Sequence, residues 1–195
     1  MPLQWVGDLS IEDAYLLQEN SYYNRILEFG CGGSTIIFSQ GESEVTSVET
    51  DQGWIDLTKE RLSVLGTENQ VTFKAYEEDW GDNYDLVFVD GIDQLRLEFA
   101  IKAWNLIGPR GGTMVFHDTR RFQDFKNAMW VAQLYFEEVH SIDVNRRESN
   151  LTFIYKRSKP LGYENWNETE GKPKWAYGIP DGVERTRLWT QEDLK

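Results

Sequence analysis

Four carboxylates and one histidine lie at or just before the ends of short apolar runs, where strands are predicted to end: Glu28, Glu49, Asp90, His117 and Asp118. A carboxylate can accept hydrogen bonds from sugar hydroxyls, and paired carboxylates can hold a divalent cation. A histidine titrates near neutral pH and can act as a general base. If these runs form neighbouring parallel strands, the side chains meet at one edge of a sheet, where ligands bind.

A glycine turn follows the first of these runs. Residues 26–35 are typical of a short buried strand, a sharp turn and the start of a helix. The turn contains three glycines: Gly30, Gly32 and Gly33. Glycines let the backbone turn sharply and let a ligand approach where a Cβ would clash. Ser34 and Thr35 are predicted to cap the helix, whose free N–H groups attract electron-rich atoms.

The spacing of the turn distinguishes two nucleoside cofactors. Glu49 lies about one strand–helix–strand repeat after the turn, where a carboxylate can bind both ribose hydroxyls of a nucleoside. A dinucleotide site needs Gly-x-Gly-x-x-Gly, but the sixth position here is Thr35, and Glu28 precedes the first glycine by two residues. The turn therefore fits a dinucleotide less well, and a glycine turn in some other α/β protein is an open alternative.

The run Glu28-Phe-Gly-Cys-Gly-Gly-Ser-Thr35 resembles the first motif of class I S-adenosylmethionine-dependent methyltransferases. The resemblance implies that Glu28 and the glycines hold the amino-acid end of S-adenosylmethionine (SAM) and that Glu49 holds its ribose. Ser34 departs from the usual Glu-x-Gly-x-Gly-x-Gly pattern, because it replaces the third glycine. The form that ends in Gly-Gly-Ser-Thr is similar to that of some small members of the family.

Composition limits the class of protein. The 195 residues carry 20 basic and 33 acidic side chains and a formal net charge of −13. This balance argues against a nucleic-acid partner, which Lys and Arg side chains would have to bind. The single cysteine, Cys31, excludes an internal disulfide and a Cys-based zinc site. Because no secretory signal or transmembrane run is visible, we expect a cytoplasmic protein without a membrane partner.

Strand and helix signals alternate along the chain. Predicted strands occupy residues 26–29, 44–48, 71–75, 86–89 and 113–116, and predicted helices occupy residues 10–19, 35–38, 52–65, 94–107 and 121–135. Helical spacing places Trp54 and Leu57 on the core face of one helix and Phe122 on the core face of another. Residues 138–144 and 150–155 alternate as a closing hairpin.

These elements predict an α/β fold with a Rossmann-like, doubly wound and mostly parallel seven-stranded sheet that ends in an antiparallel hairpin. Residues 1–157 are expected to form a SAM-binding methyltransferase domain. Residues 158–195 combine Pro and Gly breakers with several Trp and Tyr side chains. We expect an irregular arm that covers apolar surface of the domain or of a partner subunit in a homo-oligomer.

Two later strand ends extend the resemblance to about residues 20–157. Phe88-Val-Asp-Gly91 and Phe116-His-Asp-Thr119 are similar to small class I methyltransferases that end their fourth strand in Asp-Gly and their fifth in His-Asp. In that family an acid after the third strand lies near the adenine amino group, and Glu77 fits this position best, with Glu78 second. The implied cofactor-binding residues are Glu28, Gly30, Gly32, Gly33, Ser34, Thr35, Glu49, Glu77 and Asp90.

Asp90, His117 and Asp118 are the predicted catalytic residues. Methyl transfer to a hydroxyl needs alignment, exclusion of water and removal of the acceptor proton, for which His117 is the candidate base. Purely structural roles, such as a backbone-bonded histidine or a helix-capping aspartate, are an open alternative. Metal-dependent catechol-type members end these strands in Asp and Asp-Asn, but Thr119 replaces the Asn here. A divalent metal is therefore chemically reasonable but not favoured, and no metal ligand is assigned.

The predicted function is methyl transfer from SAM to a small-molecule acceptor, with a hydroxyl oxygen as the favoured acceptor atom. One alternative is a non-catalytic nucleoside-binding or scaffold protein with the same fold. A dinucleotide-dependent oxidoreductase is the less favoured alternative, because the third glycine of its motif is missing.

Overall fold

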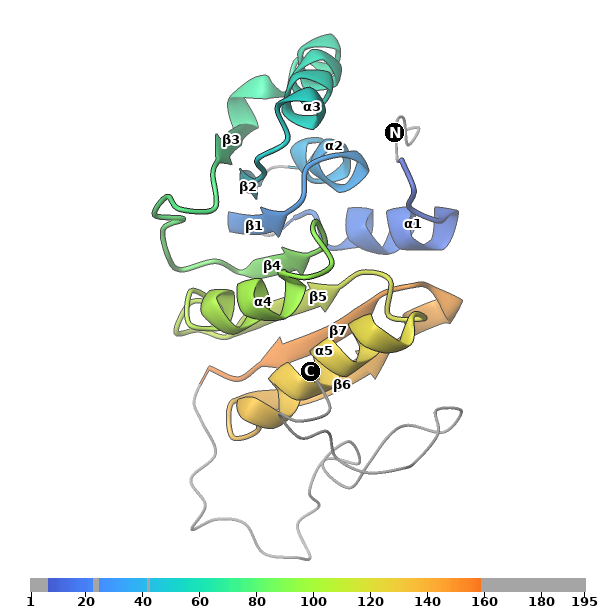
Figure 1. The fold of residues 1–195 in the computed structure, drawn as a ribbon, viewed down its shortest axis with the longest axis vertical. Helices are drawn as coiled ribbons and strands as arrows, with labels where there is room; N and C mark the ends of the chain where they lie inside the picture. The colour runs from blue at the N-terminus through green and yellow to red at the C-terminus, as the bar shows by residue number, and fades with distance from the viewer. Residues whose placement is uncertain (1–6, 23–24, 42, 159–195) are drawn as a thin grey trace, which may run out of the picture.

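Seven strands form one continuous sheet in the computed structural model, which describes residues 7–22, 25–41 and 43–158. The strands are β1 (Arg25–Phe29), β2 (Glu44–Val48), β3 (Val71–Lys74), β4 (Leu86–Val89), β5 (Gly112–Phe116), β6 (Val139–Val144) and β7 (Thr152–Lys156). Their order across the sheet is β3-β2-β1-β4-β5-β7-β6 (Figure 1). Strands β1 to β5 are parallel, and β7 is antiparallel to both β5 and β6. The predicted fold class is therefore confirmed.

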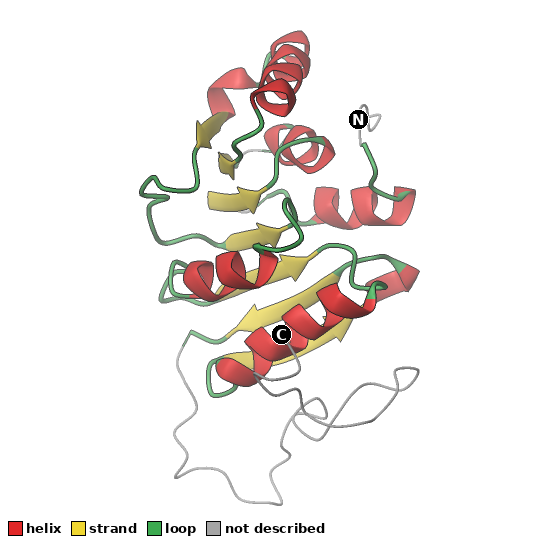
Figure 2. Ribbon diagram, in the orientation of Figure 1, coloured by secondary structure: helices red, strands yellow, loops and turns green. Residues whose placement is uncertain are grey.

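Helices cover both faces of this sheet (Figure 2). They are α1 (Ile11–Glu19), α2 (Gly33–Ser39), α3 (Gln52–Leu65), α4 (Arg96–Trp104) and α5 (Phe122–Leu134), with short 3₁₀ turns η1 (Glu68–Gln70) and η2 (Arg146–Glu148). The predicted capping box opens α1, since Ser10 Oγ accepts from the Asp13 N–H and the Asp13 carboxylate accepts from the Ser10 N–H. The predicted irregular arm, residues 158–195, lies outside the described residues except for Ser158.

The strand side chains alternate between two hydrophobic cores. On β1, Leu27 and Phe29 pack in the core that contains Phe99 of α4, whereas Ile26 packs in the core that contains Leu16 of α1. Side chains on a strand point to opposite faces in turn, so a central strand between two helix layers must be apolar on both faces. The sheet is thus buried from both sides, and its carboxyl edge is left open for a site.

Two aromatic side chains predicted for the core are instead exposed. Trp54, in the first turn of α3, is 50% exposed, and Phe122, at the start of α5, is 59% exposed. The core-facing residues of α3 are Thr58 and Leu62. Leu57, which was also predicted for the core, is 37% exposed, so the core assignments of Trp54, Leu57 and Phe122 were wrong. Helical spacing identifies one face of a helix, but it does not show which turns of that face the sheet covers.

The chain crosses itself tightly where β1 and β4 end. Gly30 has a φ of +86°, and a Cβ built on it would lie 2.7 Å from the Cα of Gly91. Only glycine meets both requirements, because a left-handed φ strains other residues and the gap leaves no room for a methyl group. The glycine turn therefore holds the two strand ends at van der Waals contact.

Gly30→Ala is expected to lower the free energy of unfolding by about 2–4 kcal/mol, from backbone strain and overpacking together. Gly66→Ala is the matched control. Gly66 also has a left-handed φ, of +69°, but nothing lies within 4 Å of its built Cβ. Urea unfolding followed by circular dichroism should show a smaller loss for Gly66→Ala, and equal losses would contradict the close approach of Gly30 to Gly91.

Candidate functional site

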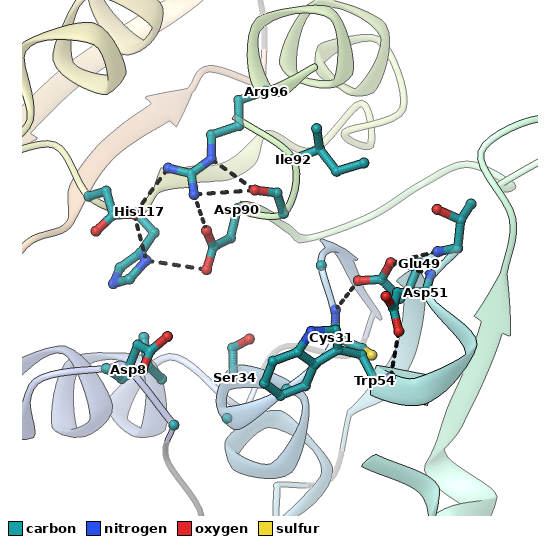
Figure 3. Close-up of a pocket in the computed structure, with 18 of the residues that line it drawn as sticks. Asp8, Cys31, Ser34, Glu49, Asp51, Trp54, Asp90, Ile92, Arg96 and His117 are labelled. Atoms are coloured by element: carbon teal, nitrogen blue, oxygen red, sulfur yellow. Dashed lines mark hydrogen bonds and ion pairs between the residues drawn. The ribbon is translucent and has the colours of Figure 1, made fainter. Parts of the chain in front are cut away.

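A cavity of about 710 Å³ opens at the carboxyl ends of β1, β4 and β5. Eight of the residues singled out from the sequence line it: Gly30, Gly32, Gly33, Ser34, Glu49, Asp90, His117 and Asp118. Figure 3 shows Arg96, Asp90 and His117 on one wall and Glu49 with Asp51 on the opposite wall. The parallel topology thus brings together side chains that are up to about ninety positions apart in the sequence.

Glu28 lies beneath the turn and does not line the cavity. Its side chain is fully buried and accepts hydrogen bonds from the hydroxyls of Ser34, Thr35 and Ser47. Burial raises the pKa of the Glu28 carboxyl to about 7, although the three hydroxyls act in the opposite direction. The geometry gives Glu28 the role of fixing the glycine turn from below. A direct contact with the amino-acid end of a cofactor stays a prediction.

The hydroxyls of Ser34 and Thr35 do not cap α2 in the predicted way. Gly32 occupies the N-cap position, which leaves Ser34 and Thr35 inside the first turn of the helix. Thr35 Oγ1 accepts from the Gly32 N–H at 2.9 Å and donates to Glu28. Ser34 donates only to Glu28. The prediction placed the start of the helix two residues too late. The hydroxyls of Ser34 and Thr35 donate to the buried carboxylate of Glu28 instead, and local sequence does not show that Glu28 lies within their reach.

Glu49 lies between two cavities. It lines the main cavity and also a neighbouring cavity of about 280 Å³, and Thr50 is shared in the same way. One carboxylate oxygen accepts from the Thr50 N–H at 2.6 Å and the Asp51 N–H at 2.8 Å, and the other lies 3.4 Å from the Cys31 N–H. The carboxylate is thus held rigidly where β2 ends. It is placed to bind a ligand that spans both cavities.

The predicted adenine contact is only partly matched by the geometry. Glu77 is exposed and lines neither cavity, whereas Glu78, the second choice, lines the smaller cavity together with Glu49. Glu78 Oε1 also accepts from the Ala75 N–H at 3.1 Å. The turn after β3 therefore places Glu78, which is also exposed, at the smaller cavity, a detail that depends on turn geometry rather than on residue type.

Arg96 is the functional residue that the sequence reasoning missed. Its side chain is buried, with 3% of the residue exposed. Its guanidinium lies 2.6 Å from Asp90 Oδ1 and 3.2 Å from Asp118 Oδ2. It also pairs with Asp93 at 3.1 Å and with Asp124 at 2.9 Å. A lone basic residue at the start of an apolar helix, six positions after Asp90, was the available signal, because a buried arginine requires acidic partners.

His117 is surrounded by carboxylates. Its Nδ1 lies 3.2 Å from Asp90 Oδ2 and 3.6 Å from Asp118 Oδ2, and its Nε2 lies 3.8 Å from Asp13 Oδ2. Burial alone would lower the pKa of His117, but the pairing with Asp13 and Asp90 and the charge of Asp118 raise it to about 10. An imidazolium has no free lone pair to accept a proton. The raised pKa of His117 therefore argues against this residue as the general base at neutral pH.

Asp90 is ionised within this network. Burial would raise the pKa of its carboxyl, but the neighbouring His117 and Arg96 hold it below its ordinary value. Asp13, on the other side of His117, is fully buried and also accepts from the Asn150 N–H at 2.7 Å. Asp13 of α1 thus contacts both His117 and the loop before β7. These contacts were not visible in the sequence because the three residues are far apart along the chain.

Other cavity walls are less polar. The indole of Trp54 and the side chain of Ile92 line the cavity beside the glycine turn. Cys31, within the glycine turn, also lines the cavity, and burial is the main cause that raises the pKa of its thiol to about 12. The thiol is thus inert, as expected for a small packing residue. The exposed ring and the isoleucine offer an apolar surface for a flat or aliphatic ligand.

No protein-family model and no curated protein sequence matches the chain. Solved structures do match it. A methyltransferase-like protein from Silicibacter pomeroyi aligns with a TM-score of 0.60 at 19% identity, over 84% of this chain and 94% of that chain. This chain has the fold of class I SAM-dependent methyltransferases.

Two further matches carry a described activity. The O-methyltransferase TomG from Streptomyces achromogenes, involved in tomaymycin synthesis and solved with SAM, aligns with a TM-score of 0.61 at 16% identity, over 76% of this chain and 81% of that chain. An O-methyltransferase from Bacillus cereus, solved with S-adenosylhomocysteine (SAH), aligns with a TM-score of 0.60 at 17% identity, over 76% and 83% of the two chains. Among the described helices of our chain, none is long and apolar enough to cross a membrane.

Proposed function

We propose that this protein transfers a methyl group from SAM to a small-molecule acceptor, with a hydroxyl oxygen as the acceptor atom. The observation that carries the proposal is the meeting of the glycine turn, Glu49 and the Asp90–His117–Asp118 group around one cavity. The structural neighbours support methyl transfer, since those with a stated activity are SAM-dependent or O-methyltransferases.

The chemistry of the residues that line the cavity supports SAM as the cofactor. The backbone of Gly32 faces open space, because nothing lies within 4 Å of a Cβ built on it, and a ligand can approach there. Glu49 would hold the ribose hydroxyls, and the smaller cavity beside Glu78 would hold the base. SAM, when bound, supplies an activated methyl group on a positively charged sulfur. An acidic protein with carboxylates around the cavity favours such a cation electrostatically.

The chain's own residues would orient the acceptor and take its proton. Asp118 is half-buried and lines the cavity beside His117, so an acceptor hydroxyl can reach it. With His117 protonated, the proton-accepting role passes from the histidine to the carboxylates of Asp90 and Asp118. Trp54 and Ile92 would exclude water and place the acceptor, because alignment contributes much of the rate of a displacement reaction.

A non-catalytic nucleoside-binding protein is the second candidate. The specific observation in its favour is that Arg96 and His117 already neutralise Asp90 and Asp118, which lowers their basicity. The two functions differ in turnover: SAH should accumulate with a panel of phenols, alcohols and carboxylic acids only if the protein is an enzyme. Either way, isothermal titration calorimetry should show binding of SAM and SAH and none of NAD. Binding of NAD alone would contradict the proposal and favour the oxidoreductase.

Glu49→Ala is expected to weaken SAH binding by about 1.5–3 kcal/mol, because two charge-assisted hydrogen bonds to the ribose are lost. Glu77→Ala is the matched control: it removes an exposed carboxylate that lines neither cavity and should leave the affinity within about twofold. Calorimetry on both variants measures the effect. An unchanged affinity in a folded Glu49→Ala protein would remove Glu49 from the site.

A further inference from the structure

The group of Asp90, His117 and Asp118 has the composition of a metal site. One ligand atom from each of the three lies within 4.8 Å of the others. Carboxylates and a histidine can bind Mg²⁺, Mn²⁺ or Zn²⁺ when their lone pairs are free. Whether the site suits a metal therefore depends on what already contacts these atoms.

Both carboxylates already contact the guanidinium of Arg96. Its Nη2 lies 2.6 Å from Asp90 Oδ1, and its Nη1 lies 3.2 Å from Asp118 Oδ2. The planar guanidinium of an arginine carries N–H donors on both of its terminal nitrogens, so one arginine side chain can bridge two carboxylates. The guanidinium thus lies where a shared cation would have to lie to neutralise the pair.

Arg96 is fixed in this position from behind. Nη1 also donates to Asp124 Oδ1 at 2.9 Å, and Nη2 donates to the Gly91 carbonyl at 3.3 Å. Asp124 is itself buried, on the first turn of α5, and it lies outside the cavity lining. A buried guanidinium with this many acceptors cannot leave without exposing several unpaired carboxylates, which is costly.

The remaining side of the group is occupied by His117. Its Nδ1 lies 3.2 Å from Asp90 Oδ2 and 3.6 Å from Asp118 Oδ2, so the imidazole is a second neighbour of each carboxylate. At the surface, Arg121 pairs with Asp118 as well. A divalent ion bound here would bring two further positive charges within a few ångströms of the Arg96 guanidinium, which Coulomb repulsion opposes. The residues present do not fit a metal.

We propose that Arg96 is a built-in cation that takes the place of a divalent metal between Asp90 and Asp118, so that this site binds no metal. In this role Arg96 is a positioning residue: it holds the two carboxylates at the cavity wall and neutralises part of their charge. The inference deepens the proposed function, because it makes methyl transfer metal-independent. The metal-binding half can be tested without any turnover.

Manganese binding to the purified full-length protein provides the test. Free Mn²⁺ is measured by electron paramagnetic resonance while MnCl₂ is titrated into EDTA-dialysed protein. The wild type should bind Mn²⁺ no tighter than about 1 mM, the weak limit of protein sites for hard divalent cations. Arg96→Ala should gain one site that is about tenfold tighter or more, because Asp90, Asp118 and Asp124 lose their shared cation. Asp90→Asn added to Arg96→Ala should remove the gained site.

Arg110→Ala is the matched control, since it removes one positive charge from a side chain that is 85% exposed, pairs with Asp85 and does not line the cavity. It should leave Mn²⁺ binding as weak as in the wild type. Stoichiometric Mn²⁺ binding to the wild type that Asp90→Asn abolishes would overturn the proposal, and this measurement does not depend on the folding of Arg96→Ala. A folded Arg96→Ala that gains no site would also overturn it.

Calorimetry with SAH on the wild type separates this inference from the proposed function. If SAH does not bind while the wild type rejects Mn²⁺ and Arg96→Ala gains it, the proposed function fails and Arg96 is still the cation of the site. If SAH binds and the wild type holds Mn²⁺ at Asp90, the function stands and the assignment of Arg96 fails. Each result therefore identifies which of the two statements is wrong.

Discussion

Asp118→Asn is expected to lower the turnover number by about 10²–10⁴-fold, while the dissociation constant of SAH changes by less than about threefold. Asparagine keeps the shape of the side chain but cannot accept a proton. Removal of the acceptor proton matters only in the transition state, so kcat should respond and cofactor binding should not. The turnover number is measured as SAH production with an acceptor found in the panel of phenols, alcohols and carboxylic acids. The dissociation constant of SAH is measured by calorimetry.

Asp93→Asn is the matched control for this experiment. Asp93 contacts the same two arginines as Asp118, at 3.1 Å from Arg96 and 3.6 Å from Arg121, but it is exposed and does not line the cavity. Loss of its charge should change kcat by less than about threefold, because exposed ion pairs contribute little. If Asp93→Asn and Asp118→Asn lose turnover equally, the effect comes from the charge around the arginines, and Asp118 is not the proton acceptor.

The pH profile of kcat distinguishes the two candidate bases. If His117 accepts the proton, kcat should rise with pH as far as its pKa of about 10. If the carboxylate of Asp90 accepts it, kcat should be flat between about pH 6 and 8, because the pKa of Asp90 is held below its ordinary value and the group is ionised throughout this range. We expect the flat profile. A rise of about tenfold per pH unit across this range would restore His117 as the base.

The sequence predicted the elements of the fold better than the network inside it. The boundaries of β2, β4 and α3 were predicted correctly, because each lies between strong local signals such as the Asp51 cap and Gly66. The convergence of Glu49, Asp90 and His117 on one cavity also followed from sequence, since a parallel sheet places all its strand ends at one edge. Element boundaries and strand ends follow from residue types and from the spacing of apolar residues, and both can be read from one amino-acid sequence.

The ion-pair network could not be predicted in the same way. The contact of His117 with Asp13 joins residues about a hundred positions apart, and it depends on α1 packing over the end of β5. The link between Arg96 and Asp124 likewise depends on the crossing of two helices. Such contacts change the protonation of a residue without changing its type. His117 therefore seemed a suitable base from its sequence position, whereas its surroundings make it a cation.

His117 is expected to make the protein less stable as the pH rises from about 6.5 to 10. The pKa of this residue is raised from 6.5 to about 10 in the folded chain, so the folded state holds a proton that the unfolded state releases. The stabilisation is complete below pH 6.5 and is lost as the pH passes through 10. The difference between the pKa of His117 in the unfolded chain and its pKa in the folded chain sets an upper limit of about 5 kcal/mol for this loss in the free energy of unfolding.

The partners of His117 should produce the opposite trend in acid. The pKa values of Asp90 and Asp13 are held below their ordinary value of 3.8, in part by the histidine. Their contribution is present above pH 3.8 and is lost as the pH falls through the lowered pKa values. Together the three groups predict a plateau of stability between about pH 4 and 6.5, with a decline on both sides.

His117→Gln should flatten the alkaline decline, and His140→Gln is its matched control, because His140 is exposed on β6. Urea unfolding between pH 6 and 10 gives the free energy for each protein. The difference between wild type and His117→Gln should be largest at pH 6 and shrink toward pH 10, since tyrosine, lysine and cysteine titrate alike in both proteins. A difference that stays constant with pH would mean that His117 is neutral in the folded chain. In that case the argument that a protonated His117 cannot act as the general base would also be wrong.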